Sequence, residues 1–579
     1  MLFRTHRLSG TRETHHTLKC WPVGYEVPES TSSPGSLEWA KAKLDECATS
    51  HSCTQHSVVI LPDRVLDVGD PSGNWVRLLE PDFEAGQYVC LSHCWGTHAF
   101  LCTLKSNIAT HRDGIPLEKL PRTFRDAVHF TRLLGLRYLW VDSLCIIQDD
   151  VNDWRTQAAK MADIYANAHL TIAAAHSDGP RAGLYSTPKS ESRAHRLPLS
   201  RSSSLDGTGP GLYARRAIAH IDNRYVGSAA ASSLSNDELP LLQRAWFFQE
   251  RFLSRRVLYF TSAELAWQCP ARVSCQCRGD QDDVSPDHLP VDLGSKTANP
   301  RKYYHTSALA VAIESKGMEE VARRWLDLVS DYSMLEMTFD RDVLPALSGL
   351  ATVFGVLLET AYKAGLWEEF ILPGLLWYPN DSGRKPWGNR PRAWRAPSWS
   401  WASVKTGVSF LTVKELLHPC EVVSVDCQLS GPFTTGEVAS GQLVLRGLVS
   451  TAIVRYTPAS GDLRPWNVYV LDFMQTGILA NSYADYNITA DGPGKVEDGA
   501  VVYCFLVGVQ AQLGTPYLLI LKEEESGQGE SYGRRLSRIG LVEVFGRKVR
   551  RGSPDGIVRM VSPYEVIRDR STEETLMVV

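Results

Sequence analysis

The sequence lacks the features that would place the chain in several common classes. Its 61 basic and 65 acidic residues leave a formal net charge of −4, so no basic excess favours nucleic acid or an anionic lipid surface. The polar start of the chain has no apolar core of a secretory signal. The most apolar stretch, Ala346–Leu358, is too short to span a bilayer and is expected to be a buried helix. We therefore predict no nucleic-acid partner, no transmembrane segment and a cytoplasmic location.

Short catalytic signatures are missing as well. The sequence has no Walker A motif, no glycine-rich dinucleotide motif after a strand, no HExxH and no GxSxG elbow. The chain therefore lacks the motifs by which nucleotide-binding proteins, zinc proteases and α/β-hydrolases are commonly identified. Any site must therefore be located from the arrangement of the predicted strands and helices.

Cysteines are present in an odd number, thirteen, and are scattered along the chain. This pattern favours reduced thiols over a disulfide framework. Two groups lie close together in sequence: Cys269, Cys275 and Cys277, and Cys47, His51 and Cys53. Neither has the paired spacing typical of a structural zinc site, so zinc is an alternative to buried thiols and no metal ligand is assigned.

The chain is long enough for two to four domains, and its 44% of hydrophobic residues is ordinary for packed proteins. Shifts in composition divide it. The predicted parts are a loose leader (1–35), a lead-in segment (36–84), an α/β domain (85–270) with a polar insertion (177–240), a helical extension (306–400) and a β-rich C-terminal module (401–579).

The α/β domain has the most regular pattern. Apolar strands are predicted at Tyr88–Leu91, Tyr138–Val141 and Leu170–Ala174. The helix after the first strand is predicted to start near Thr123, and the helix after the second has Asp153 as its predicted N-cap residue. Gly135 is expected to end the first helix in a left-handed conformation. Such alternation indicates a parallel, doubly wound sheet. The glycine-separated β runs after Ser398 indicate an antiparallel sheet instead.

Three polar loops follow the three predicted strands, at Ser92–Trp95, Asp142–Cys145 and His176–Asp178. Because the carboxyl ends of parallel strands meet at one sheet edge, these loops are expected to converge on a ligand site. Asp142 is the strongest candidate there. A nucleophilic thiol, Cys94 or Cys145, is a weaker alternative, because sequence adjacency does not supply the positive neighbour that a thiolate needs.

Glu250 is a second acidic candidate. It follows Trp246 by one helical turn, so both side chains can border one cleft, and an acid beside an aromatic ring can act as a general acid or base. The alternative is an ion pair with a nearby arginine, which surface acids commonly form. The arginines in reach are Arg251, Arg255 and Arg256.

Several segments resemble the heterokaryon-incompatibility (HET) domain of fungi. They are Tyr88–Gly96 (YVCLSHCWG), Leu120–Phe124 (LPRTF), Leu136–Trp154 (LRYLWVDSLCIIQDDVNDW), Met161–Ala174 (MADIYANAHLTIAA) and Arg244–Phe260 (RAWFFQERFLSRRVLYF). The flanking segments Asp340–Ala351 and Arg395–Ser403 resemble the regions that follow the domain in long family members. His93 departs from the pattern, because a tyrosine is more familiar there.

The resemblance implies a function in self/non-self recognition and programmed cell death. HET domains are thought to be similar to Toll/interleukin-1-receptor (TIR) domains, so the resemblance implies a TIR- or flavodoxin-like parallel sheet. Some TIR domains cleave NAD with a glutamate that follows a tryptophan by four residues, which by analogy makes Glu250 the catalytic residue. The residues expected around the substrate are Ser92, His93, Trp95, Asp142 and Trp246.

NAD is then a substrate, and no cofactor is firmly assigned. The partner is expected to be a second copy of the chain or another incompatibility protein. The alternative to an enzyme is an adaptor that acts through self-association of the HET domain.

Overall fold

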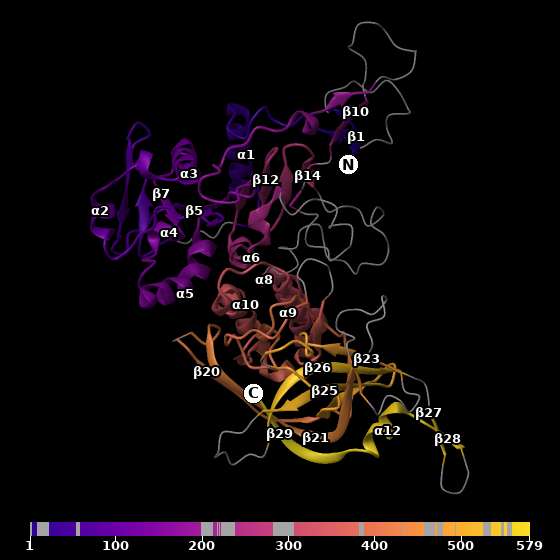
Figure 1. Ribbon diagram of the computed structural model, residues 1–579. Helices are drawn as coiled ribbons and strands as arrows, with labels where there is room; N and C mark the ends of the chain where they lie inside the picture. Colours follow the sequence, from indigo (N-terminus) through magenta and orange to yellow (C-terminus); the bar gives the residue numbers. More distant parts are fainter. Residues whose placement is uncertain are drawn as a thin grey trace, which may run out of the picture. The chain divides into compact units, whose positions relative to one another are not determined.

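The computed structural model describes residues 3–8, 23–51, 53, 58–197, 212–216, 218, 220–221, 238–281, 306–380, 387–431, 433–456, 469–471, 479–492, 494–524, 534–545, 549–552 and 558–579. The chain divides into two compact units, Met1–Leu309 and Ala310–Val579 (Figure 1). Each unit is described by itself below.

Four parallel strands form the centre of a ten-stranded sheet in the first unit. They are β5 (Tyr88–Ser92), β7 (Tyr138–Val141), β8 (Leu170–Ala173) and β11 (Val257–Phe260). All of their residues are buried, which explains why they are apolar on both faces. Their spatial order is β7-β5-β8-β11, or 2-1-3-4 along the chain, as in flavodoxin-like sheets. The predicted α/β fold with a parallel sheet is confirmed.

Antiparallel strands extend this centre on both sides, which the sequence pattern did not predict. They are β3 (Val65–Asp67), β4 (Trp75–Leu79) and β6 (Ile115–Pro116) beyond β7, and β12 (Leu265–Gln268), β13 (Val273–Cys275) and β14 (Gly279–Gln281) beyond β11. The strands are short, so alternating polarity has little length in which to appear.

Helix α1 (Pro34–Ser50) precedes the sheet in the chain. The helices between the central strands are α2 (Ile108–Asp113), α3 (Arg122–Leu133), α4 (Asp142–Cys145), α5 (Val151–Asn167) and α6 (Ala245–Leu253). Gly135 follows α3 with φ of 76°, as predicted. The predicted cap of α5 was wrong. Asp150 accepts the backbone N–H groups of Asn152 and Asp153, while the Asp153 carboxylate binds Arg64 at 2.5 Å.

Parts of the predicted leader and insertion are strands. β1 (Phe3–Leu8) pairs antiparallel with β10 (Leu212–Arg216), and β2 (Val23–Gly24) and β9 (His195–Arg196) complete a small sheet. Residues 9–22 and 222–237 of these two predicted segments lie outside the described residues.

The second unit begins with helices α8 (Thr306–Lys316, which crosses the boundary between the units), α9 (Met318–Ser333) and α10 (Ser348–Leu358). Trp325 of α9 is fully buried. The helical stretch Asp340–Leu358 has the length and apolarity of a membrane span, and 56% of its most apolar window is buried inside the protein. That degree of burial also fits a core helix of a packed unit.

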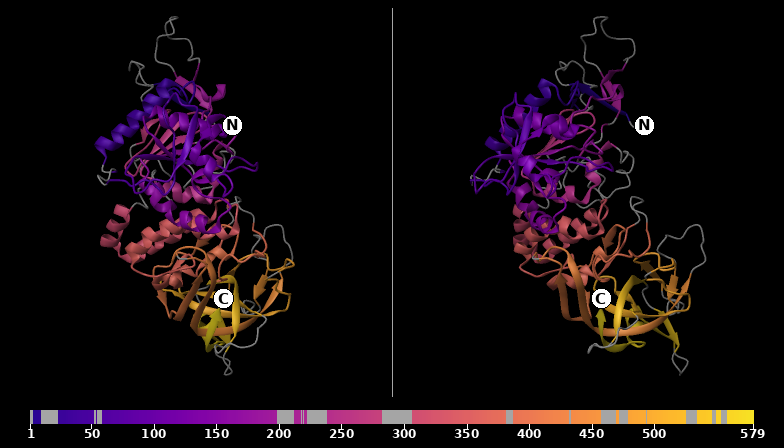
Figure 2. Two further views of the ribbon diagram at one scale, coloured as in Figure 1. Left: turned by 90° about the vertical axis from the view of Figure 1, so that its left-hand side faces the viewer. Right: turned by 60° about the vertical axis from the view of Figure 1, so that its left-hand side comes forward.

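Every β run predicted for the C-terminal module forms a strand: β20 (Glu421–Leu429), β21 (Val438–Tyr456), β22 (Tyr469–Leu471), β24 (Val501–Gln510), β25 (Thr515–Glu523) and β26 (Arg535–Phe545). With β19 (Leu416–Leu417), β23 (Leu479–Ala484) and β29 (Thr572–Val578) they form a nine-stranded, mainly antiparallel sheet. Its longer strands are strongly curved (Figure 2).

Smaller elements complete the second unit. They are β15 (Tyr362–Lys363), β16 (Leu366–Trp367), α11 (Ile371–Gly374), β17 (Trp377–Pro379), β18 (Val408–Phe410), β27 (Val549–Gly552), β28 (Val558–Val561) and α12 (Pro563–Arg568).

A buried arginine joins the helical part of this unit to its sheet. Arg538 of β26 forms an ion pair with Asp485 at 3.0 Å and donates to the carbonyl oxygens of Leu375 and Trp377 at 2.6 and 2.5 Å. Because a buried charge is tolerated only when its donors are satisfied, these contacts hold the two parts together. The predicted segments 306–400 and 401–579 therefore share one compact unit.

Central strand β7 gives a direct test of the sheet. Leu139 is fully buried, so Leu139→Ala should lower the free energy of unfolding by about 2–5 kcal/mol, measured by denaturant titration. Leu133, which is 39% exposed on α3, provides the matched Leu→Ala control and should cost less than about 1 kcal/mol. Equal losses would contradict the placement of β7 in the core.

Candidate functional site

A hydrogen bond between Ser92 and Glu250 lies at the carboxyl edge of the parallel strands. Ser92 is the last residue of β5, and its hydroxyl donates to the Glu250 carboxylate of α6. Ser92 is 2% exposed and Glu250 is 6% exposed. Residues 158 positions apart are thus brought together beneath the surface. Strands β5 and β8 are the first and third of the four, so the pair lies where the strand order reverses, the usual ligand position in such sheets.

The environment of Glu250 makes its carboxyl group titrate near neutrality. Burial raises its pKa to about 7, and the negative charge of Asp142 acts in the same direction. The Ser92 hydroxyl, the positive charge of Arg244 and a hydrogen bond with Tyr165 oppose this rise. A carboxyl group with such a pKa can take up or release a proton at physiological pH, as a general acid or base must.

Tyr165 and Arg244 are the two site residues that sequence reasoning did not select. Tyr165 lies on the buried face of α5, where an aromatic ring fits an apolar stripe. Its buried hydroxyl was the available signal, because a buried hydroxyl group needs a hydrogen-bond partner. Arg244 directly precedes α6 and acts through its charge, which no local pattern reveals.

Trp95 and Asp142 form a half-buried rim beside this pair. The indole N–H of Trp95 donates to one Asp142 carboxylate oxygen at 2.8 Å, and the backbone N–H of Ser143 donates to the other at 2.7 Å. These two bonds fix the Asp142 carboxylate and the orientation of the indole. An aromatic ring held in this way can provide a stacking surface at the sheet edge.

His93 packs into an aromatic cluster. Its ring is perpendicular to that of Phe124, with centroids 4.8 Å apart, and its Nδ1 lies 3.7 Å from an Asp142 oxygen. Burial lowers the pKa of His93, so the ring is neutral at physiological pH. His93 therefore brings an uncharged ring to this loop.

Trp246 and His176 lie beside the site without a described hydrogen bond to Glu250. Trp246 is half-buried one turn before Glu250 on α6 and packs against the core. In the third loop, His176 lies 3.2 Å from the carbonyl oxygen of Leu184, and Ser177 donates to the carbonyl oxygen of Gly183. The third loop thus bonds to the segment that follows it.

The loops after β5 and β8 touch backbone to backbone. Gly96 has φ of 66°, and a Cβ atom there would lie 3.3 Å from both the carbonyl oxygen of Asp178 and the Cα of Gly179. Only glycine allows this contact without displacing the neighbouring loop. The first and third loops are therefore packed together at the edge of the site.

The arginine alternative for Glu250 is not observed among the described residues. Arg251 donates to Gln268 at 2.9 Å, Arg255 to Asn167 at 3.4 Å and Arg256 to the carbonyl oxygen of His169 at 3.1 Å. Consecutive helical residues point in different directions, so α6 turns Arg251 toward β12 and Glu250 toward β5.

The thiol alternative is also disfavoured. Cys94 and Cys145 are both buried, and burial raises the pKa of Cys145 to about 12. A thiol with so high a pKa is not ionised at neutral pH and is a poor nucleophile.

A surface hollow of about 530 Å³ lies along the start of α5, lined by Asp63, Arg64 and Asp153 among others, and includes none of the residues predicted to bind substrate.

Comparison with known proteins identifies the domain. The order of its parallel strands and the buried Ser92–Glu250 pair define a doubly wound α/β domain with a site at the switch point. Residues 88–250 match the family described as heterokaryon incompatibility protein (HET). Residues 88–250 of this chain therefore form a HET domain, as the sequence motifs predicted.

One curated relative is heterokaryon incompatibility protein 6, OR allele, of Neurospora crassa. It is 32% identical over 93 residues, which cover 15% of this chain and 14% of that protein. No solved structure matches the chain. The aligned region thus spans a small part of either protein.

The pH dependence of stability tests the state of Glu250. Its folded-state pKa, about 7, exceeds the ordinary value of 4.5, so its protonated form stabilises the fold at low pH and this contribution is lost as pH rises from 4.5 through 7. The Glu250→Gln variant has no carboxyl group that can ionise at this position, so it cannot lose this contribution. The variant should gain on the order of 3 kcal/mol relative to wild type between pH 4.5 and 8, measured by denaturant titration. Exposed Glu118→Gln should show a constant difference, and a constant difference for Glu250→Gln would contradict the raised pKa.

Proposed function

We propose that this HET-domain protein acts in fungal self/non-self recognition by triggering cell death in the cytoplasm, and that it does so by cleaving NAD. The heterokaryon-incompatibility class rests on the domain match. The proposed chemistry rests on one observation: a buried carboxyl group with a pKa of about 7, positioned by Ser92 at the switch point of a doubly wound sheet.

The proposed reaction is hydrolysis of the bond between nicotinamide and ribose. The C1′–N1 bond breaks with its electron pair going to nicotinamide, which leaves as a neutral molecule, and positive charge develops on the ribose. The ionised Glu250 carboxylate stabilises that charge. Water then bonds to C1′, and its proton passes to Glu250 and on to solvent. The products are nicotinamide and ADP-ribose.

Other site residues would bind and orient the substrate in this proposal. Ser92 holds the Glu250 carboxylate in place, and Trp95, fixed by Asp142, offers a ring on which nicotinamide can stack. Trp246 borders Glu250 from the preceding helical turn. His93 is buried against Phe124 and so holds the loop after β5 in place.

The proposed activity is latent in the single chain. Glu250 is only 6% exposed, so a substrate cannot reach it unless the neighbouring loops move. Self-association, or binding to another incompatibility protein, would supply the free energy for that movement. No other cofactor is part of this reaction.

The same burial also favours a second candidate, a non-enzymatic adaptor. An acid that is hydrogen-bonded to Ser92 and Tyr165 and shielded from solvent can serve to orient α6. The domain would then act through contacts between its surfaces, and Glu250 would matter for folding alone.

The discriminating experiment measures NAD in yeast cells that express the full chain fused to an inducible dimerisation module. Dimerisation of wild type should deplete NAD and release nicotinamide, and Glu250→Gln should reduce the rate by at least about 100-fold. Glu118→Gln is the matched control and should behave as wild type. If wild-type cells die while their NAD is unchanged, the enzyme is rejected and the adaptor is supported. Equal NAD loss in wild-type and Glu250→Gln cells would reject the role of Glu250.

A further inference from the structure

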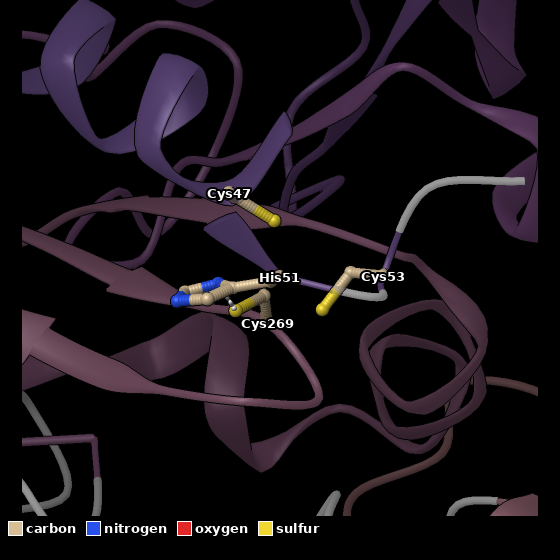
Figure 3. A group of neighbouring side chains, drawn as sticks. All are labelled: Cys47, His51, Cys53 and Cys269. Atoms are coloured by element: carbon tan, nitrogen blue, oxygen red, sulfur yellow. Dashed lines mark hydrogen bonds between the residues drawn. The ribbon is translucent and has the colours of Figure 1, made fainter. Parts of the chain in front are cut away.

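Four potential metal ligands from two distant parts of the sequence converge beside the sheet. Cys47 lies in the last turn of α1, His51 directly follows that helix, Cys53 lies two residues further on, and Cys269 directly follows β12. One ligand atom from each lies within 4.8 Å of all the others. In Figure 3 the sulfur atoms of Cys47 and Cys53 are turned toward the group, and the His51 ring lies beside the sulfur of Cys269. The two cysteine groups noted in the sequence are thus divided differently in space, because Cys269 joins the N-terminal group.

The spacing suits tetrahedral coordination. Bonds of about 2.3 Å to sulfur and about 2.0 Å to nitrogen place the ligand atoms of a tetrahedral zinc ion roughly 3.5–3.8 Å apart. The Sγ atom of Cys269 lies 3.5 Å from Nδ1 of His51. This separation matches the tetrahedral value, and the other ligand atoms lie within 4.8 Å of one another.

The ligand chemistry selects the metal. Three thiols and one imidazole form a soft donor set that favours zinc over magnesium or calcium, and four protein ligands leave no position for substrate. Cys47 and Cys269 are fully buried, and the guanidinium of Arg256 donates to the Cys47 sulfur at 3.3 Å. We propose that Cys47, His51, Cys53 and Cys269 bind a structural zinc ion.

This ion would fasten α1 to the edge of the HET sheet. Arg272, in the turn after β12, forms an ion pair with Glu46 of α1, so the two elements already meet beside the cysteines. Zinc would close a loop of more than 200 residues between Cys47 and Cys269, which raises stability by restricting the unfolded chain. The segment that precedes the HET domain would then be part of its fold.

A second cluster carries the same inference independently. His220, Glu264, Cys275 and Cys277 are all buried with ligand atoms within 4.8 Å of one another. Nδ1 of His220 lies 3.6 Å from Oε1 of Glu264 and 3.7 Å from Sγ of Cys275, which is 3.8 Å from Sγ of Cys277. The other Glu264 oxygen accepts the Cys277 N–H at 2.6 Å, which leaves Oε1 to face the cluster. These separations match tetrahedral zinc, so this cluster is a second site.

Metal analysis of the full chain, purified under reducing conditions without chelator, tests both sites. Wild type should contain about two zinc ions per chain by mass spectrometry of the metal. Cys53→Ala and Cys269→Ser should each retain about one, and so should Cys275→Ser. Cys102→Ser, at a half-buried cysteine outside both clusters, is the control and should retain both. Unchanged zinc in the variants of a cluster overturns that site, and zinc-free wild type overturns both.

Two further measurements remain decisive where a variant fails to fold. Cys53→His keeps a zinc ligand at a half-buried position and should retain the ion that Cys53→Ala loses. In wild type, cobalt should replace zinc and give the intense absorption of tetrahedral thiolate coordination, and a strong chelator should abolish it and lower the melting temperature. Retention of zinc by Cys53→Ala, or a Cys47–Cys269 disulfide in wild type purified under reducing conditions, would overturn the first site.

Discussion

The site depends on the parallel pairing of four buried strands. In the register of these strands, Leu91 lies opposite Val141 and Ser92 opposite Ala173, so Ser92 and Asp142 leave the sheet at the same edge. Because the strands are covered on both faces, polar side chains can gather only beyond their ends. A slip of one residue would turn Ser92 to the other face of the sheet and separate it from Glu250. Register is thus the constraint on which the hydrogen bond, and with it the proposed chemistry, relies.

The central strands and the candidate site were predictable because their causes are local. Uninterrupted apolar runs predicted the parallel sheet, and the rule that ligands lie beyond strand ends selected Ser92 and Asp142. The spacing from Trp246 selected Glu250, which the structure places against Ser92. The β runs of the C-terminal module were equally visible, since glycines separate several of them.

The features that were missed arise from contacts between distant residues. Asp150 and Asp153 are equivalent N-cap candidates in sequence, and only the position of Arg64 decides which of them caps α5. The partners of Cys269 could not be assigned either, because its nearest cysteines in sequence belong to another cluster. Likewise, Arg538 joins helices and sheet through carbonyl groups more than 150 residues away, which no window of sequence contains.

The contact between Gly96 and Gly179 links two loops that lead away from opposite sides of the switch point. Neither backbone can shift outward alone without losing its packing against the other. If the domain acts as proposed, exposure of Glu250 would therefore require both loops to move together. A signal that depended on such a joint movement would be switched in an all-or-none manner.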